Sequence, residues 1–98
     1  MTRDEVLAKL REHESALRAH GVVRLSLFGS TARGDGRPDS DIDLMAKYDD
    51  TKRISLLDIV GIQLDLESVL GRPVDLVEEG RLKPRVQRSV ERDVVNAF

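Results

Sequence analysis

The chain of 98 residues contains no cysteine and no tryptophan, and its aromatic residues are Phe28, Tyr48 and Phe98 alone. Without cysteine, disulfides and thiolate metal sites are excluded. Three scattered aromatic residues provide no platform on which nucleic-acid bases could stack. No apolar stretch is long enough to span a membrane, and the amino terminus lacks a signal-peptide pattern. We therefore expect a cytoplasmic protein that does not associate with a membrane.

An excess of charge of one sign is also missing. Sixteen basic and 18 acidic residues leave a formal net charge of −2, whereas nucleic-acid binders normally show a basic excess, so we expect no direct nucleic-acid binding. A local basic cluster comprises Arg81, Lys83, Arg85 and Arg88; it is interpreted as a solvated face, or as a surface that docks an acidic partner or nucleic acid. Linkers and repeats are absent, which indicates one domain over residues 1–98.

The most informative segment runs from Leu25 to Leu44. Its first part, Arg24 to Phe28, is typical of a strand. Gly29 permits a backbone turn that other residues resist, and Ser30 is a good N-cap for a short helix to Arg33. Free backbone N–H groups and a hydroxyl would then point to one place. Such a place attracts phosphate.

Two carboxylates follow on the next predicted strand, which covers about 42–47. The turn-rich loop 34–40 brings this strand back beside the first. Asp41-Ile42-Asp43-Leu44 alternates strictly, so both carboxylates face one side. They repel each other unless a divalent cation bridges them. A plainer interpretation is that Asp41 ends the loop and Asp43 faces solvent.

Gly29-Ser30, ten further residues and Asp41-x-Asp43 resemble the signature of the DNA polymerase beta-like nucleotidyltransferase superfamily. The resemblance extends to Gly71-Arg72-Pro73-Val74-Asp75-Leu76-Val77. A chain this short looks most like the minimal nucleotidyltransferases (MNT), which are often antitoxins paired with HEPN-domain toxins. The resemblance implies an α/β (α+β) domain of polymerase beta-like fold, with a small mixed sheet flanked by helices. We expect the helices on one face of this sheet.

The resemblance also implies an activity, namely transfer of AMP from ATP to a tyrosine hydroxyl of a cognate HEPN toxin. Asp41, Asp43 and Asp75 would be the catalytic and metal-binding residues, holding two Mg²⁺ ions, and Asp75 would help to take the acceptor proton. Gly29 and Ser30 would bind the nucleotide phosphates. Two alternatives remain open: a non-catalytic antitoxin that neutralises its partner by occlusion, and a small-molecule nucleotidyltransferase.

Several further residues have alternative roles. Arg33 would either balance phosphate charge or brace its loop through a salt bridge, and Arg37 could share the first role. Ser40 is predicted near the nucleotide or metal, although it also suits a turn. His13 and His20 lack a nearby nucleophile or metal-ligand pattern, so we interpret both as structural or exposed.

Apolar spacing predicts the remaining elements. Helices are expected over about 2–20, 55–70 and 84–92, and a strand over 74–77. Residues 94–98 could extend the last helix; by resemblance to the family we predict a short closing strand. The helix over 55–70 has two apolar stripes that together span roughly 240°, more than one core requires. The second stripe is either buried within the domain or meets a partner chain, in a homo- or hetero-oligomer.

Overall fold

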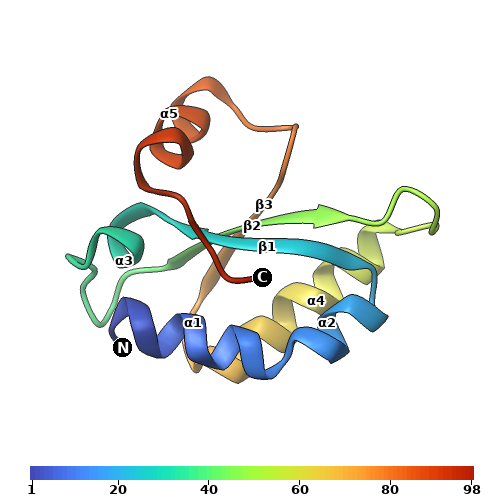
Figure 1. Ribbon diagram of the computed structural model, residues 1–98, viewed down its shortest axis with the longest axis horizontal. Helices are drawn as coiled ribbons and strands as arrows, with labels where there is room; N and C mark the ends of the chain where they lie inside the picture. Colours follow the sequence, from blue (N-terminus) through green and yellow to red (C-terminus); the bar gives the residue numbers. More distant parts are fainter.

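The computed structural model describes all residues, 1–98, and its centre is a four-stranded mixed β-sheet (Figure 1). The strands are β1 (Val22–Phe28), β2 (Ile42–Tyr48), β3 (Val74–Glu78) and β4 (Val95–Asn96), in the order β3-β2-β1-β4. β1 runs antiparallel to β2 and β4, while β2 and β3 are parallel. The predicted mixed sheet and the closing strand are confirmed.

One face of the sheet is covered by α1 (Arg3–Glu12), α2 (Glu14–Ala19) and α4 (Leu56–Leu70), whereas α5 (Pro84–Asp93) lies across the other face (Figure 1). The short α3 (Gly29–Arg33) follows β1 directly. The expectation that helices cover one face only is therefore wrong for α5. Its Val86 and Val90 pack with Phe28 and Met45 on the second face, which removes these side chains from water.

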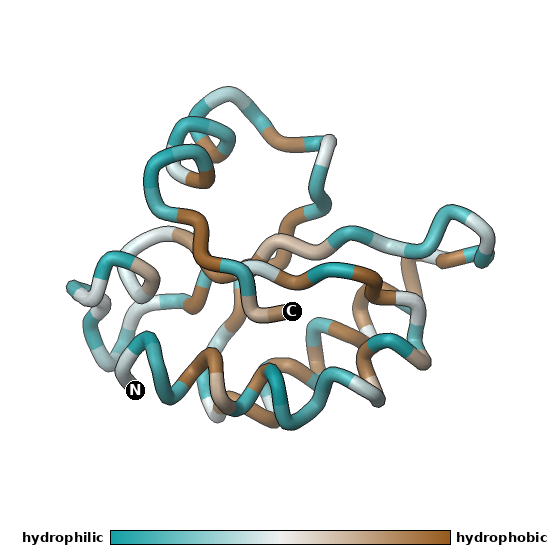
Figure 2. Tube along the Cα trace, in the orientation of Figure 1, coloured by the Kyte–Doolittle hydropathy of each residue, from teal (hydrophilic) through white to brown (hydrophobic).

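The main core lies on the first face. Alternation along the strands points Leu25, Leu27, Ile42 and Leu44 toward α1, α2 and α4, and none of these four side chains is exposed. Figure 2 shows the apolar residues concentrated along the strands and the helices beneath them. Each fully buried leucine or isoleucine contributes about 1.5–3 kcal/mol relative to an exposed one. This core holds the strands whose opposite side chains form the candidate site.

One helical prediction is wrong, and for another helix the structure decides between two alternatives. The helix expected over 2–20 is two helices, because the backbone leaves the helical region at His13 (φ −102°, ψ 10°). The apolar spacing continues across this break and gave no signal of it. The second stripe of α4 does not pack within the domain, since Leu57 is 83% exposed. No helix has both the length and the apolar content needed to cross a membrane.

Candidate active site

The turn at Gly29 brings the backbone against a carboxylate. Gly29 follows the end of β1 in a left-handed conformation, with φ 74°, which strains residues with a Cβ atom. A Cβ atom at this position would also overlap Oδ2 of Asp43. Both restrictions favour glycine, and the turn places the amino end of α3 beside β2.

Asp43 and Asp75 are register partners on the parallel strands β2 and β3. They lie on the face opposite the main core, as the alternation predicts. The Asp43 side chain is half-buried, and the pKa of its carboxyl is raised to about 6. Burial is the largest cause, followed by the negative charges of Asp75 and Asp41, while Arg33 acts in the opposite direction. The strands thus bring two carboxylates close together, and a bound cation would offset the resulting electrostatic repulsion.

Asp41 precedes β2, is exposed, and is close enough to add to the charge repulsion at Asp43. No three acid or histidine side chains in the chain are grouped closely enough to form a metal cage. Mg²⁺ rarely uses such a cage; it is usually held by one or two carboxylates together with water and substrate phosphates. The adjacent pair Asp43 and Asp75 fits this mode of binding, with Asp41 as the next available carboxylate.

An open hollow of about 400 Å³ surrounds this pair. It is bounded by the turn after β1, by the carboxylates and by one face of α5. Its polar and glycine lining consists of Gly29, Ser30, Arg33, Asp43, Asp75, Arg85, Ser89 and Arg92. The hollow therefore places cationic side chains opposite carboxylates, an arrangement suited to a ligand with both phosphate and metal.

α5 contributes residues that the sequence analysis did not assign to a site. Arg85, Ser89 and Arg92 follow one another at intervals of four and three residues, so they share one helix face. From the sequence, Arg85 belongs to a basic surface cluster, and Ser89 and Arg92 have no predicted role. The spacing of these residues after Pro84 indicates that they share one helix face, but it does not indicate that this face is directed toward the carboxylates.

Arg33 makes bracing contacts. Its Nη1 donates a hydrogen bond to Oδ2 of Asp93 at 2.7 Å, and its Nε donates to Asp35 at 3.3 Å. The Asp93 side chain is only 3% exposed and also accepts from Arg92. Hydrogen bonds from Arg92 and Arg33 lower the pKa of the Asp93 carboxyl. Arg33 thus joins α3 to α5, as one of the two predicted roles requires; its phosphate contact stays a prediction.

Arg72, like Ser89 and Arg92, has no role predicted from the sequence. Its Nη2 donates to the carbonyl oxygens of Arg37, at 2.7 Å, and of Ser40, and to the hydroxyl of Ser40 at 3.2 Å. Ser40 in turn donates its hydroxyl to the Arg37 carbonyl. These bonds fix the end of the loop directly before Asp41. Ser40 lies outside the hollow, so its ligand contact also remains a prediction.

The two histidines are distant from this site in the fold. His13 and His20 line a separate groove between α2 and α4, together with Leu17, Asp65 and Val69. That groove lies on the opposite side of the sheet from Asp43 and Asp75.

Comparison with known proteins connects this geometry to a family. The family model described as a nucleotidyltransferase domain matches residues 7–96. The protein adenylyltransferase MntA of Thermococcus cleftensis is 35% identical over 96 residues, which cover 97% of this chain and 95% of the relative.

Solved structures agree with this match. A protein proposed to be a minimal nucleotidyltransferase is 38% identical, with a TM-score of 0.77 and coverage of 97% of this chain and 95% of the other. The complex of a tri-AMPylated Shewanella oneidensis HEPN toxin with its MNT antitoxin matches with a TM-score of 0.66. It is 18% identical and covers 95% of this chain and 71% of the other; that likeness concerns the fold.

Proposed function

The chain belongs to the nucleotidyltransferase domain family and is a nucleotidyltransferase, and we propose that it transfers AMP from ATP to a HEPN-type partner protein. The observation that supports this most strongly is the pairing of Asp43 with Asp75 in a hollow that also contains the Gly29-Ser30 turn and three arginines. In this proposal the protein acts as an antitoxin by modifying its partner.

Binding of the nucleotide follows from the charges around the hollow. Gly29 and Ser30 bind the β- and γ-phosphates through backbone N–H groups and the Ser30 hydroxyl. Arg85 and Arg92 face these groups from α5 and offset the phosphate charge. Arg33, held by Asp93, keeps α3 and α5 at a fixed separation.

Asp41, Asp43 and Asp75 are the residues that would hold two Mg²⁺ ions. When bound, the ions supply positive charge to the phosphoryl and leaving-group oxygens. A tyrosine oxygen of the partner attacks the α-phosphorus, and the bond from this phosphorus to the oxygen bridging to the β-phosphate breaks. Pyrophosphate leaves, and the tyrosine proton passes to a carboxylate oxygen of Asp75, the more exposed acid of the pair.

The partner assignment is supported by two of the similar proteins. The MntA relative is named a protein adenylyltransferase, and the Shewanella oneidensis complex pairs an MNT antitoxin with an AMPylated HEPN toxin. The match covers 97% of this chain and 95% of that relative. Sites for small molecules are usually enclosed and mostly apolar, whereas the hollow beside the carboxylates is open and polar. This favours a protein acceptor over a small-molecule acceptor.

Intact-mass spectrometry tests this proposal. The protein is co-expressed with the product of the gene adjacent to its own, which this proposal expects to be a HEPN protein, then incubated with ATP and Mg²⁺. We expect one or more AMP units on the partner and none with an Asp43→Asn/Asp75→Asn variant. A stable complex with an unmodified partner, from both wild type and variant, would contradict AMP transfer and favour neutralisation by occlusion.

A further inference from the structure

The outward face of α4 is apolar and largely exposed. We define the α4 stripe as Leu56, Leu57, Val60, Gly61 and Leu64. Leu57 is 83% exposed, Leu56 76%, Leu64 59% and Val60 44%. The opposite side of the helix is buried through Ile62, Leu66 and Leu70. Large apolar side chains gathered on one exposed helix face are characteristic of an interaction surface.

Gly61 indicates what kind of surface this is. It lies inside α4 in the middle of the stripe, and a Cβ atom there would meet nothing within 4 Å. Packing within the chain therefore does not require glycine, although glycine in a helix interior costs about 1 kcal/mol relative to alanine. Glycine does allow another backbone to approach closely. A second helix crossing α4 near Gly61 uses this space.

The position of α4 limits what the second helix can belong to. α4 covers the face of the sheet that contains Ile42 and Leu44, whereas Asp43 and Asp75 lie on the other face (Figure 1). A protein docked on the stripe cannot present an acceptor hydroxyl to the carboxylates through the same contact. The stripe is thus free to bind a molecule other than the acceptor, with the active site still accessible.

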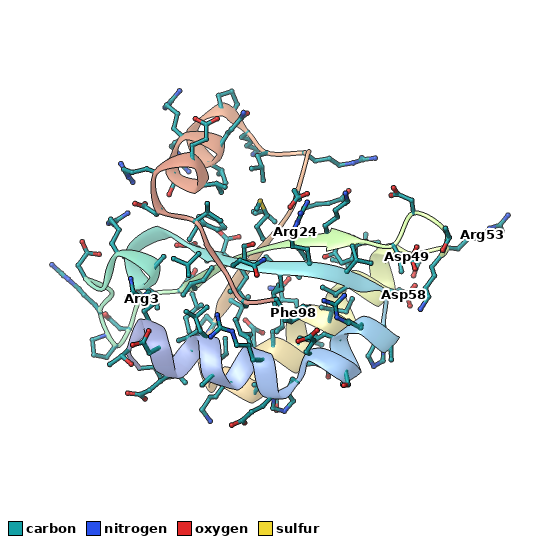
Figure 3. All side chains as sticks on the ribbon, viewed as in Figure 1. Arg3, Arg24, Asp49, Arg53, Asp58 and Phe98 are labelled. Carbon is teal, nitrogen blue, oxygen red and sulfur yellow. The ribbon has the colours of Figure 1, made fainter.

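Charges at the two ends of the stripe are complementary to each other. Lys52 and Arg53 precede the helix, and Figure 3 shows Arg53 extending outward at this end. The exposed Asp65 lies toward the other end, two residues before Glu67, whose carboxylate accepts a hydrogen bond from the Val74 N–H of the same chain. In an antiparallel pair of α4 helices crossing near Gly61, the basic end of each helix lies beside the acidic end of the other. The two helix dipoles are then also opposed, which is favourable.

We propose that the α4 stripe is the interface of a symmetric homodimer. A two-fold axis passes near Gly61, so the same patch is used by both copies. Leu57 of each copy then packs beside Leu64 of the other, about four residues on either side of the crossing. Both hollows face outward, on the sides of the dimer remote from the contact, and each remains open to nucleotide and acceptor.

Sedimentation velocity of the full chain across a concentration series tests the proposal. We expect a dimer at micromolar concentration. Leu57→Glu and Leu64→Lys, made singly, each bury an unpaired charge twice in the symmetric contact. Each should weaken dimerisation by about 100-fold or more. Val94→Glu is the matched control, because Val94 is another exposed apolar residue at 43% but lies at the end of α5; it should leave the dimer unchanged.

The double variant L57E/L64K distinguishes the antiparallel arrangement from other contacts. Seven residues separate the two positions, about 10 Å along one helix, so the new charges cannot pair within a copy. Across the antiparallel contact they do pair, and we expect at least about 10-fold recovery of affinity over either single variant. Circular dichroism verifies that every variant is folded.

Three results would overturn the homodimer. These are a wild-type chain that stays monomeric to about 100 μM, a dimer that L57E and L64K leave intact, and a double variant no tighter than the single ones. A monomeric wild type whose HEPN partner is released by L57E would assign the stripe to that partner instead. The test uses no nucleotide, so its outcome is independent of AMP transfer.

Discussion

The two faces of the β-sheet are built from alternate residues of the same strands, yet they serve opposite purposes. On β2, Ile42 and Leu44 enter a closed apolar core under α1, α2 and α4. Asp43, between them, faces α5 and a hollow that contains arginines. The first face stabilises the domain through burial. The second concentrates like charges and raises the pKa of Asp43, which costs stability.

The contrast between the two faces explains why three helices cover one face closely and α5 covers the other only in part. A helix packed tightly over Asp43 and Asp75 would fill the space that a nucleotide needs. α5 contacts that face only through a small apolar group with Phe28, Met45 and Val90, and leaves the carboxylates open. Strained or mutually repelling groups that the fold tolerates are commonly found at functional sites. The following predictions test this contrast, from the largest effect to the smallest.

Asp43→Asn should nearly abolish activity. Removing one carboxylate of the pair removes several kcal/mol of electrostatic stabilisation, so we expect AMP transfer to fall by at least about 1,000-fold. Transfer is measured by intact mass of the partner. Asp39→Asn, in the loop before the site, is the control and should keep most of the activity. Equal activity of Asp43→Asn and wild type would show that the second face is not the reaction centre.

Leu44→Ala should lower stability, in contrast to Asp43→Asn, which should lower activity. It opens a cavity in the closed core and should lower the free energy of unfolding by about 3 kcal/mol, as measured by urea denaturation. Met45→Ala, one residue on, affects the smaller apolar group beside the hollow, so a loss of about 2 kcal/mol or less is expected. If Met45→Ala cost more than Leu44→Ala, the first face would not be the principal core.

The raised pKa of Asp43 predicts a pH dependence of stability. A carboxyl with a folded-state pKa of about 6 instead of 3.8 holds its proton more tightly in the folded protein. Below about pH 3 it is neutral in both states and costs nothing. The cost grows as pH rises from about 4 to 6 and is complete above about pH 7, where the carboxyl is ionised in both states. Without metal, stability should therefore fall through this window relative to Asp43→Asn.

The size of that difference is reduced by solvent, because Asp43 is only half-buried. We expect Asp43→Asn to be more stable than wild type by about 1–2 kcal/mol at pH 7.5, and equal to it near pH 3. Urea denaturation of both proteins in EDTA at several pH values gives the two curves. If the difference in unfolding free energy between the two proteins were the same at every pH, Asp43 would not titrate in this window.

Arg72→Met should produce a smaller catalytic defect. The loop before Asp41 loses its hydrogen bonds from Nη2, and loss of positioning should lower kcat by about 10-fold. Arg37→Met is the matched control, because the Arg37 side chain does not line the hollow and only its carbonyl accepts from Arg72. A change in stability with unaltered kcat would assign Arg72 a purely structural role.

Much of the fold followed from local patterns. Alternation along β2 placed Asp43 opposite Ile42 and Leu44, and apolar spacing predicted a helix over 55–70, where α4 lies. The structure adds a capping box of Ser55 and Asp58 at the start of this helix. The break at His13 did not follow, since the apolar spacing is the same on both sides. Nor did the position of α5, because an amphipathic helix packs equally well against either face until long-range contacts select one.

The candidate site was predicted on its strands and overlooked on its helix. Alternation, a local property, placed Asp43 on the polar face of its strand, whereas Asp75 was grouped with Gly29 and Asp43 only through the family resemblance. The register that pairs Asp43 with Asp75 joins strands far apart in the sequence. Arg92 and Ser89 are far from them in sequence and join the hollow only through the docking of α5. Arg72 acts on backbone carbonyl oxygens, which any sequence would supply, so no pairing of residue types indicated it.

The central claim is that the carboxylate face is a nucleotide site maintained at a cost in stability. Thermal unfolding of wild type and Asp43→Asn, with and without Mg²⁺ and a non-hydrolysable ATP analogue, tests it directly. At 100 times the Kd, the ligand adds about 2.7 kcal/mol, so the wild-type Tm should rise by about 10 °C or more. Asp43→Asn should begin higher and rise far less. Equal rises in both proteins, or none in the wild type, would contradict the account.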